Sequence, residues 1–458
     1  MKNIFFFLSF IFFSPILQAQ NTTPLPGGEA VLSLSALKDS ALCNNIALRK
    51  GRLDIEAAME QRKEAFTHYF PSISGTALGF HANRPMAQMD IDPSQYITPE
   101  LGATLAQMLP AEALMALSSP MTIEMMKKGA LVGITAMQPL FTGGQIVLGN
   151  KLARLGEEAS KLQLQLSEKD VEAQVEQYYW QLVSMQEKTR TLDAVDSLLG
   201  TIRHDVETAV KAGVALNNDL LQVQLRQNDI QSQRLKLNNG EALVKMLLGQ
   251  LCNLTSDFEV RIDSSPLPTD PFSPGGESVS LTLLPEYQLL EKKVEAARLQ
   301  RKMEVGKNLP SAAVGAGYTY HNLLGDNQHF GMLFATVNVP ITDWWGGSHA
   351  IRRKKIVEQQ AREQLIDNAR LLEIRAQKAA NDVAEAQSQL ALANQSMEQA
   401  EENLRIHRNT YRAGTSTMSD LLQAQLLQQQ ACDQRTDAFI AFQNACLAYR
   451  QATGLNPE

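Results

Sequence analysis

The sequence predicts a mainly α-helical protein made of two tandem repeats, each with a pair of β-strands followed by a long helical hairpin. The main observation is a phrase that occurs twice, as VKAGVALNNDLLQVQ from Val210 and as YRAGTSTMSDLLQAQ from Tyr411. A second motif, QPLFTGG from Gln138, returns from Val339 as VPITD and then Gly-Gly. The two motifs are equally far apart in both halves, which indicates a duplicated architecture.

The N-terminus and the net charge set limits on location and partners. Lys2 is followed by an apolar run from Ile4 to Leu17 and then by Ala19, the pattern of a secretory signal peptide. We therefore expect residues 1–19 to be a signal peptide and the chain to be exported. The net charge of −7 gives no reason to expect nucleic acid or another polyanion as a partner.

The first repeat is expected over residues 20–249. A helix from Leu34 to about His68 comes first and ends before Pro71, because proline disfavours helix in the residue that precedes it. The later elements are strands near 71–83 and 131–141, separated by an insertion at 84–129, and a helical hairpin at 145–249. A proline-rich linker or equatorial segment follows at 250–280.

The second repeat, 281–458, is expected to have strands near 311–322 and 330–341 and a helical hairpin at 348–454. The alternation of side chains puts an apolar set on one face of each strand. Strands of this length with one apolar face fit a transmembrane β-strand and a half-buried soluble strand equally well. The apolar sets are Val314, Ala316, Tyr318 and Tyr320 in one strand and Phe330, Met332 and Phe334 in the other.

The number of strands turns the membrane interpretation into a prediction about assembly. Four strands cannot close a barrel, since about eight are needed for the smallest one. An open sheet cannot sit in lipid either, because its edges would leave backbone groups unpaired. If the strands are transmembrane, several chains must pool them.

The helical hairpins carry apolar residues every seven positions, as in helices that pack along a seam. No Gly or Pro interrupts residues 348–413. An unbroken helix of about 65 residues would be roughly 100 Å long. The seam positions are Val171, Tyr178, Met185, Leu192, Leu199 and Val206 in the first half and Ala376, Val383, Leu390, Met397, Leu404 and Tyr411 in the second.

The repeated phrase itself is expected to form the bend of each hairpin. Gly213 and Gly414 can adopt the left-handed conformation that ends a helix. Asn217 or Asn218 in the first copy, and the Thr417–Ser419 segment in the second, offer N-caps for the returning helix. Asp219 and Asp420 then fall in its first turn, where the helix dipole favours an acidic residue.

Taken together, these pieces resemble the TolC family of outer-membrane efflux proteins. The resemblance covers about Leu34 to Gly454, and the Pro-Ser strand starts, the Gly-Gly turns and the two Ala-Gly bends carry it. It implies a homotrimer with a transmembrane β-barrel of twelve strands, four per chain, on a long periplasmic α-helical barrel. It also implies the outer membrane of a Gram-negative bacterium, and passive export of substrates from an inner-membrane pump (RND, ABC or MFS type) through a periplasmic adaptor protein.

The resemblance also implies roles for the bends. Asp420 matches an acidic position that constricts the pore, whereas Gln423 stands where the family's best-studied pattern has a second Asp. A first-turn residue favoured by the helix dipole is the alternative role for Asp420, and the two roles are compatible. The adaptor would dock on the bends, at Lys211, Ala212, Gly213, Val214, Arg412, Ala413, Gly414 and Thr415.

Two tryptophans, Trp344 and Trp345, stand beside the Gly-Gly turn of the second repeat. Indole side chains favour the boundary between lipid and water, so we expect both residues to anchor the outer-membrane lipid interface. Packing into the equatorial region is the alternative.

The insertion at 84–129 is rich in methionine. Thioether clusters can bind soft ions such as Cu(I), which would suggest metal efflux. The alternative is apolar packing over the barrel mouth, because methionine fills irregular space well. The methionines are Met86, Met89, Met108, Met115, Met121, Met125 and Met126.

The sequence offers no enzyme motif and no metal-ligand spacing, so we expect neither catalysis nor a bound metal or cofactor. One rival to the channel interpretation stays open: a periplasmic coiled-coil adaptor or scaffold without a barrel. Such a protein would have one helical hairpin flanked by soluble β-domains, whereas this sequence predicts two hairpins, each preceded by a strand pair.

Overall fold

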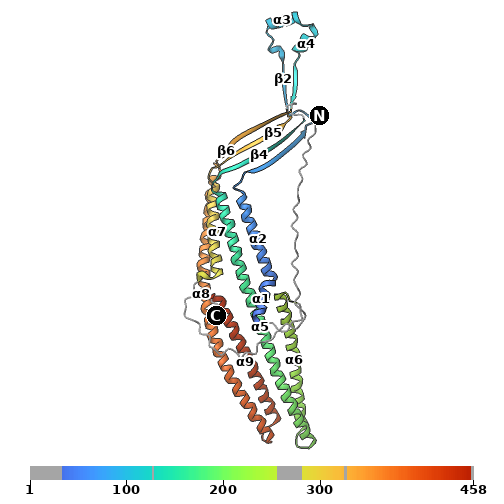
Figure 1. The fold of residues 1–458 in the computed structure, drawn as a ribbon, viewed down its shortest axis with the longest axis vertical. Helices are drawn as coiled ribbons and strands as arrows, with labels where there is room; N and C mark the ends of the chain where they lie inside the picture. The colour runs from blue at the N-terminus through green and yellow to red at the C-terminus, as the bar shows by residue number, and fades with distance from the viewer. Residues whose placement is uncertain (1–32, 126–127, 255–280, 324–326, 455–458) are drawn as a thin grey trace.

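The computed structural model describes residues 33–125, 128–254, 281–323 and 327–454 of an elongated molecule (Figure 1). A β-sheet lies toward one end, and two helical hairpins form the other. The predicted signal peptide and residues 255–280 of the predicted linker lie outside the described residues. Among the helices described, none has an apolar stretch long enough to cross a bilayer.

Both repeats have the same order of elements, as the duplicated motifs predict. The first repeat also contains the insertion, which adds two strands, two helices and the 3-10 turn η1 (Pro93–Gln95). A second 3-10 turn, η2 (Leu281–Leu283), precedes the second repeat. The first repeat consists of α1 (Leu34–Asn44), α2 (Ile46–Thr67), β1 (Ser72–His81), β2 (Ala87–Ile91), α3 (Pro99–Met108), α4 (Ala111–Ser118), β3 (Met121–Met125), β4 (Lys128–Thr142), α5 (Gln145–Lys211) and α6 (Asn217–Cys252). The second consists of α7 (Pro285–Lys307), β5 (Ser311–His321), β6 (Gln328–Asn338), α8 (Asp343–Arg412) and α9 (Met418–Thr453).

The main sheet has four antiparallel strands in the order β1-β4-β5-β6. The register between β4 and β5 shifts between Pro139 and Phe141. Proline has no N–H to donate to the ladder, so a shift at this position is expected. The strands β2 and β3 of the insertion form a separate two-stranded ribbon.

The register gives the sheet two different faces. One face of β5 has small and polar residues, and Phe334 of β6 lies over Gly315 on that face. A Cβ atom on Gly315 would come within 2.3 Å of the Phe334 ring. The apolar sets expected for the last two strands therefore lie on opposite faces, because the glycines of β5 leave room for the aromatic residues of β6. The other face is apolar and exposed, with Ile73, Val132, Ile134, Val314, Leu333 and Val337.

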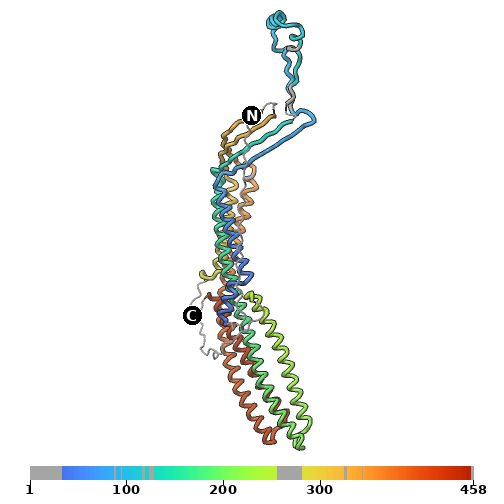
Figure 2. The backbone as a smooth tube through the Cα atoms, turned by 45° about the vertical axis from the view of Figure 1, so that its right-hand side comes forward, coloured from blue at the N-terminus to red at the C-terminus, as the bar shows by residue number. Residues whose placement is uncertain are grey.

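The helices form a single curved layer with two very long members, α5 with 67 residues and α8 with 70 (Figures 1 and 2). Near the sheet the layer runs α2-α5-α7-α8, and toward the far end it runs α6-α5-α9-α8. The predicted seven-residue seams pack inside this layer. Leu192, Leu199 and Val206 are buried in the first hairpin, and Ala376 and Val383 are buried in the second.

The helix expected as one piece from Leu34 to about His68 is broken at Asn45. The side chain of Asn45 accepts a hydrogen bond from the Ala47 N–H (2.8 Å) and so caps α2. Its amide also donates to the Leu251 carbonyl at the end of α6 (3.0 Å). The break therefore ties the N-terminal helices to the first hairpin.

A buried ion cluster joins the two ends of the described chain near the middle of the molecule. Glu176 on α5 is 2% exposed, and its carboxylate accepts from Lys38 Nζ on α1 (2.5 Å) and from Arg450 Nη2 on α9 (2.9 Å). Burial raises the pKa of Glu176, but the two cations outweigh it and hold that pKa below its ordinary value. The cluster thus links α1, α5 and α9 through one charge.

We expect Lys38→Met to destabilise the fold, because it leaves Glu176 buried with one cation fewer. Loss of one partner costs roughly 3–5 kcal/mol in a fully buried pair, and Lys38 is 26% exposed, so we expect about 2 kcal/mol. The pKa of Glu176 is depressed in the folded state, so this stabilisation is present above about pH 4.5 and is lost as the pH falls further. Thermal unfolding in detergent at pH 7 and at pH 4 measures both effects.

The control is Lys63→Met, which removes a pair with Glu60 that is exposed on both sides. Exposed pairs contribute about 0–1 kcal/mol, so this variant should unfold close to the wild type. Equal losses in both variants would contradict a special role for the buried cluster.

Candidate functional site: the two bends at the helical tip

Both helical hairpins turn through the same backbone motif. At the first bend, the Gly213 N–H donates to the Val210 carbonyl (3.0 Å) and the Val214 N–H donates to the Ala209 carbonyl (3.0 Å). Gly213 has φ +75°, the left-handed conformation in which glycine is favoured. This pair of bonds is the Schellman motif, which satisfies the last carbonyls of α5.

The second bend repeats this motif bond for bond. The Gly414 N–H donates to the Tyr411 carbonyl (2.9 Å), and the Thr415 N–H donates to the Thr410 carbonyl (3.0 Å). Gly414 has φ +73°. The left-handed glycines expected from the repeated phrase are therefore present in both copies.

The returning helices, by contrast, are capped differently. The helix α9 has a full capping box: Thr417 Oγ1 accepts from the Asp420 N–H (3.2 Å), and Asp420 Oδ2 accepts from the Thr417 N–H (3.0 Å). The helix α6 begins with Leu216 at the N-cap position, so the expected caps Asn217 and Asn218 are wrong. Only the carboxylate of Asp219 caps this end, by accepting from the Leu216 N–H (3.4 Å).

Asp420 is held in one orientation at the start of α9. Besides the Thr417 N–H, its Oδ2 accepts from the hydroxyls of Thr417 (2.7 Å) and Ser416 (3.2 Å). The Thr417 hydroxyl is the main cause that lowers the pKa of Asp420, and the carboxylate therefore stays ionised. Asp420 and Gln423 are both exposed, and their spacing puts them on the same face of α9.

The bends of one chain lie on either side of a cavity of about 590 Å³. Ile202 and Asp205 of α5, Leu216 and Asp219 of the first bend, and Arg408, Tyr411 and Met418 of the second hairpin line it. Burial is the main cause that raises the pKa of Tyr411, and the carboxylates of Asp219 and Asp205 raise it further, so the phenol stays protonated. The structure thus brings the two copies of the repeated phrase to one place.

A polar link between the hairpins lies next to this cavity, and sequence reasoning missed it. Arg226 of α6 donates from Nε to Gln425 (3.0 Å) and from Nη2 to Gln429 (2.6 Å), both on α9. Gln429 in turn donates to Gln233 (2.8 Å). The side chain of Arg226 is half-buried, and this burial is the main cause that lowers its pKa.

The predicted docking residues of both bends are all exposed. The first bend is more apolar than the second, with Val214 and Leu216 strongly exposed. Thr415 and Thr417 occupy the corresponding positions of the second bend. Lys211 and Arg412 lie in the last turns of α5 and α8, where the helix dipole favours a cation.

The two tryptophans lie far from the tip, in the first turn of α8 where the sheet meets the helices. The Trp344 indole donates to the Asn308 carbonyl at the end of α7 (2.9 Å). Trp345 is 83% exposed. This position is at the junction with the sheet, and not at the middle of the helices.

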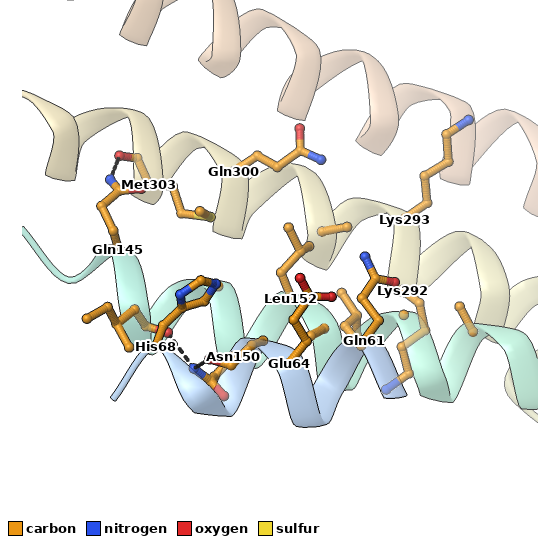
Figure 3. A pocket seen from close by; sticks show the side chains of 18 of the residues that line it. Gln61, Glu64, His68, Gln145, Asn150, Leu152, Lys292, Lys293, Gln300 and Met303 are labelled. Carbon is orange, nitrogen blue, oxygen red and sulfur yellow. Dashed lines mark hydrogen bonds between the residues drawn. The ribbon is translucent and has the colours of Figure 1, made fainter. Parts of the chain in front are cut away.

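A cavity of about 1060 Å³ lies between α2, α5 and α7 (Figure 3). Its polar side chains connect the helices: Asn150 donates to the Ala65 carbonyl (2.8 Å), Gln145 donates to the Met303 carbonyl, and Lys292 pairs with Glu158 (2.7 Å). In the part of the chain that the structure describes, no three His, Cys, Asp or Glu residues are grouped to hold a metal. The polar contacts in this groove connect α5 to α2 and to α7.

Comparison with known proteins extends these observations. Residues 284–455 match the family model described as outer membrane efflux protein. No curated protein is a significant match. Similar solved structures include the Campylobacter jejuni CmeC outer membrane channel (TM-score 0.73, 15% identity, 94% of this chain and 90% of that one). They also include the outer membrane protein VceC from Vibrio cholerae (0.70, 14%, 92% and 96%) and the open-state Neisseria gonorrhoeae MtrE outer membrane channel (0.69, 16%, 95% and 94%).

We expect Arg226→Met to loosen the two hairpins from each other, because it leaves buried amides of Gln425 and Gln429 without their donor. Each unsatisfied buried group costs roughly 1–3 kcal/mol. Hydrogen exchange over residues 418–430 should accelerate at least tenfold. Arg405→Met, which removes an exposed pair with Glu402 on α8, is the control and should leave this exchange unchanged; equal exchange in both variants would contradict the link.

Proposed function

We propose that three copies of this chain form an efflux channel, because residues 284–455 match the outer membrane efflux protein model and nearly the whole chain has the fold of solved outer membrane channels. The strands would cross the outer membrane as one barrel, and the helices would continue it through the periplasm. CmeC and MtrE, which have a similar fold, are outer membrane channels, so we propose a conduit and not an enzyme.

The observation that carries the proposal is the open sheet. Within the described residues, β1 and β6 each pair on one side only. The exposed apolar face of the sheet suits lipid, but lipid offers no hydrogen bonds to a free strand edge. Pairing β6 of one copy with β1 of the next removes both edges, and twelve strands from three copies close a barrel.

The edge helices support the same closure. On α8, Val357, Leu371, Leu392 and Ile406 are exposed and lie at multiples of seven residues. On the opposite edge of the layer, Ile46 and Leu53 of α2 and Leu221 and Leu235 of α6 are exposed at the same spacing. Apolar stripes of this kind pack against another helix. We infer that α8 of one copy lies against α2 and α6 of the next.

The sheet also has aromatic residues at both ends, as interface anchors require. Tyr318 and Tyr320 lie on its apolar face at the end that is far from the helices. Trp344 and Trp345 lie at the junction with the helices. We propose that these two ends mark the outer and the periplasmic boundary of the bilayer.

The gate of the channel is proposed at the bends. Three copies of Asp420 around one axis would line the narrow closed opening, and the repulsion among their carboxylates would be relieved when the tip dilates. Gln423 on the same face adds no charge. The capping bonds of Asp420 fix the carboxylate in place, so its roles in capping and in the gate are compatible. Opening would require the second hairpin to move against the first, with loss of the link from Arg226 to Gln425 and Gln429.

We propose two partners for the channel, a periplasmic adaptor and an inner-membrane pump. A periplasmic adaptor would dock on the exposed bends, where Val214 and Leu216 offer apolar contacts and Lys211 and Arg412 offer charge. An inner-membrane pump of the RND, ABC or MFS type would supply the energy, so that export through this chain is passive.

We expect Asp420→Ala to raise the single-channel conductance in planar bilayers. The substitution removes the carboxylate that repels permeating anions and that lines the closed opening. The matched control is Asp219→Ala, which loses the equivalent capping bond in the first hairpin. We expect the control to keep the wild-type conductance. Equal changes in both variants would show that capping alone is responsible.

Cell fractionation tests the function as a whole against the rival scaffold. The channel should be recovered with outer membranes and should require detergent for extraction. A periplasmic coiled-coil adaptor or scaffold would appear in the soluble fraction without detergent, and that result would overturn the proposal.

A further inference from the structure

The methionine-rich insertion stands clear of the rest of the molecule in both views (Figures 1 and 2). It leaves the sheet between β1 and β4, continues as the ribbon β2–β3, and carries α3 and α4 at its far end. No other described element lies beside it. The role of this segment is not explained by the barrel or by the bends.

The ribbon has one apolar and one polar face. Its register sets Ile91 opposite Met121 and the neighbouring Asp90 opposite Thr122. Thr122 donates to Asp90 across the polar face (2.7 Å). The exposed large apolar residues of the insertion are Met86, Met89, Tyr96, Leu101, Met108, Met115 and Met121.

The insertion has no core of its own. Among its residues whose side chains are described, none is buried. A two-stranded ribbon without cover is only marginally stable in water, and helices of 10 and 8 residues add little. The apolar residues of the insertion therefore need another surface to cover them.

Lipid is not that surface. The four main strands have 10 to 15 residues, and tilted strands of about 9–11 residues already span the hydrocarbon core. The insertion begins where these strands end, so it projects beyond the bilayer on the side opposite to the periplasmic helices.

Copies of the insertion are the surface within reach. With strands about 4.8 Å apart and tilted by about 40°, a twelve-stranded barrel has a radius of roughly 12 Å. A helix with its side chains is about 10–12 Å across. Three insertions that rise from one rim of this size can therefore meet on the axis without any large movement of the barrel.

We propose that the three insertions pack against one another through their methionine-rich faces and form a lid over the outer mouth of the channel. This inference rests on the proposed trimeric channel and adds a second constriction, at the end opposite to the bends. The flexible thioether side chains suit a contact that must separate when substrate leaves.

The test uses the full-length protein in planar bilayers. Met108→Lys with Met121→Lys places like charges on the packed faces of α3 and β3, and we expect the conductance to rise at least twofold. The matched control is Ala106→Lys with Thr122→Lys. It adds the same charge to the same two elements but on the opposite side of the helix and of the ribbon, and should keep the wild-type conductance.

A second measurement does not depend on conductance. Met108→Cys in a Cys43→Ser background, treated with a short bis-maleimide, should give cross-links between copies within the native trimer. A native trimer without cross-links and with unchanged conductance in the lysine variant would overturn the lid and leave the channel intact. Failure to find any trimer would overturn both.

Discussion

Within the part of the chain that the structure describes, the strands β1 and β6 each have a partner on one side only, and the layer of helices next to the sheet is open in the same way. This constraint decides how the rest of the molecule is built. In the proposed trimer, β6 of one copy would meet β1 of the next in the antiparallel sense found elsewhere in the sheet, because the sheet has an even number of alternating antiparallel strands. The same threefold rotation would bring the apolar stripe of α8 against α2 and α6, so one arrangement would pair the strand edges in the membrane and bury the apolar helix edges in the periplasm.

Duplication supplied two bends with the same backbone but different surroundings. Both end their first helix with a left-handed glycine and a Schellman motif. Gln425, however, is fully buried beneath Arg226, whereas its counterpart Gln224 is partly exposed. The capping also differs, since Asp420 has a hydroxyl partner in Thr417 and Asp219 has none among the bonds at its N-cap. The two hairpins have thus diverged at the bends, where the gate is proposed.

Features that depend on neighbouring residues in the sequence were predicted better than features that depend on contacts between distant segments. The left-handed glycines, the seven-residue seams and the strand pairs follow from residue type and period alone. The break at Asn45 was missed because it depends on the carbonyl of Leu251 on another helix. The link from Arg226 to Gln425 and Gln429 was missed for the same reason. The two glutamines are four and eight residues after Leu421, and this spacing places all three residues on one face of the helix. The face of Phe330, Met332 and Phe334 depends on the register with β5, which the sequence of one strand does not contain.

The central claim is that neighbouring copies close both edges of the chain. Cryo-electron microscopy of the protein extracted in detergent tests it most directly, because it counts the copies and shows the seam between them. We predict a threefold particle with a twelve-stranded barrel in which β6 of each copy pairs with β1 of the next. A particle in which β1 or β6 remains unpaired, or a single chain with a closed fold of its own, would contradict the account.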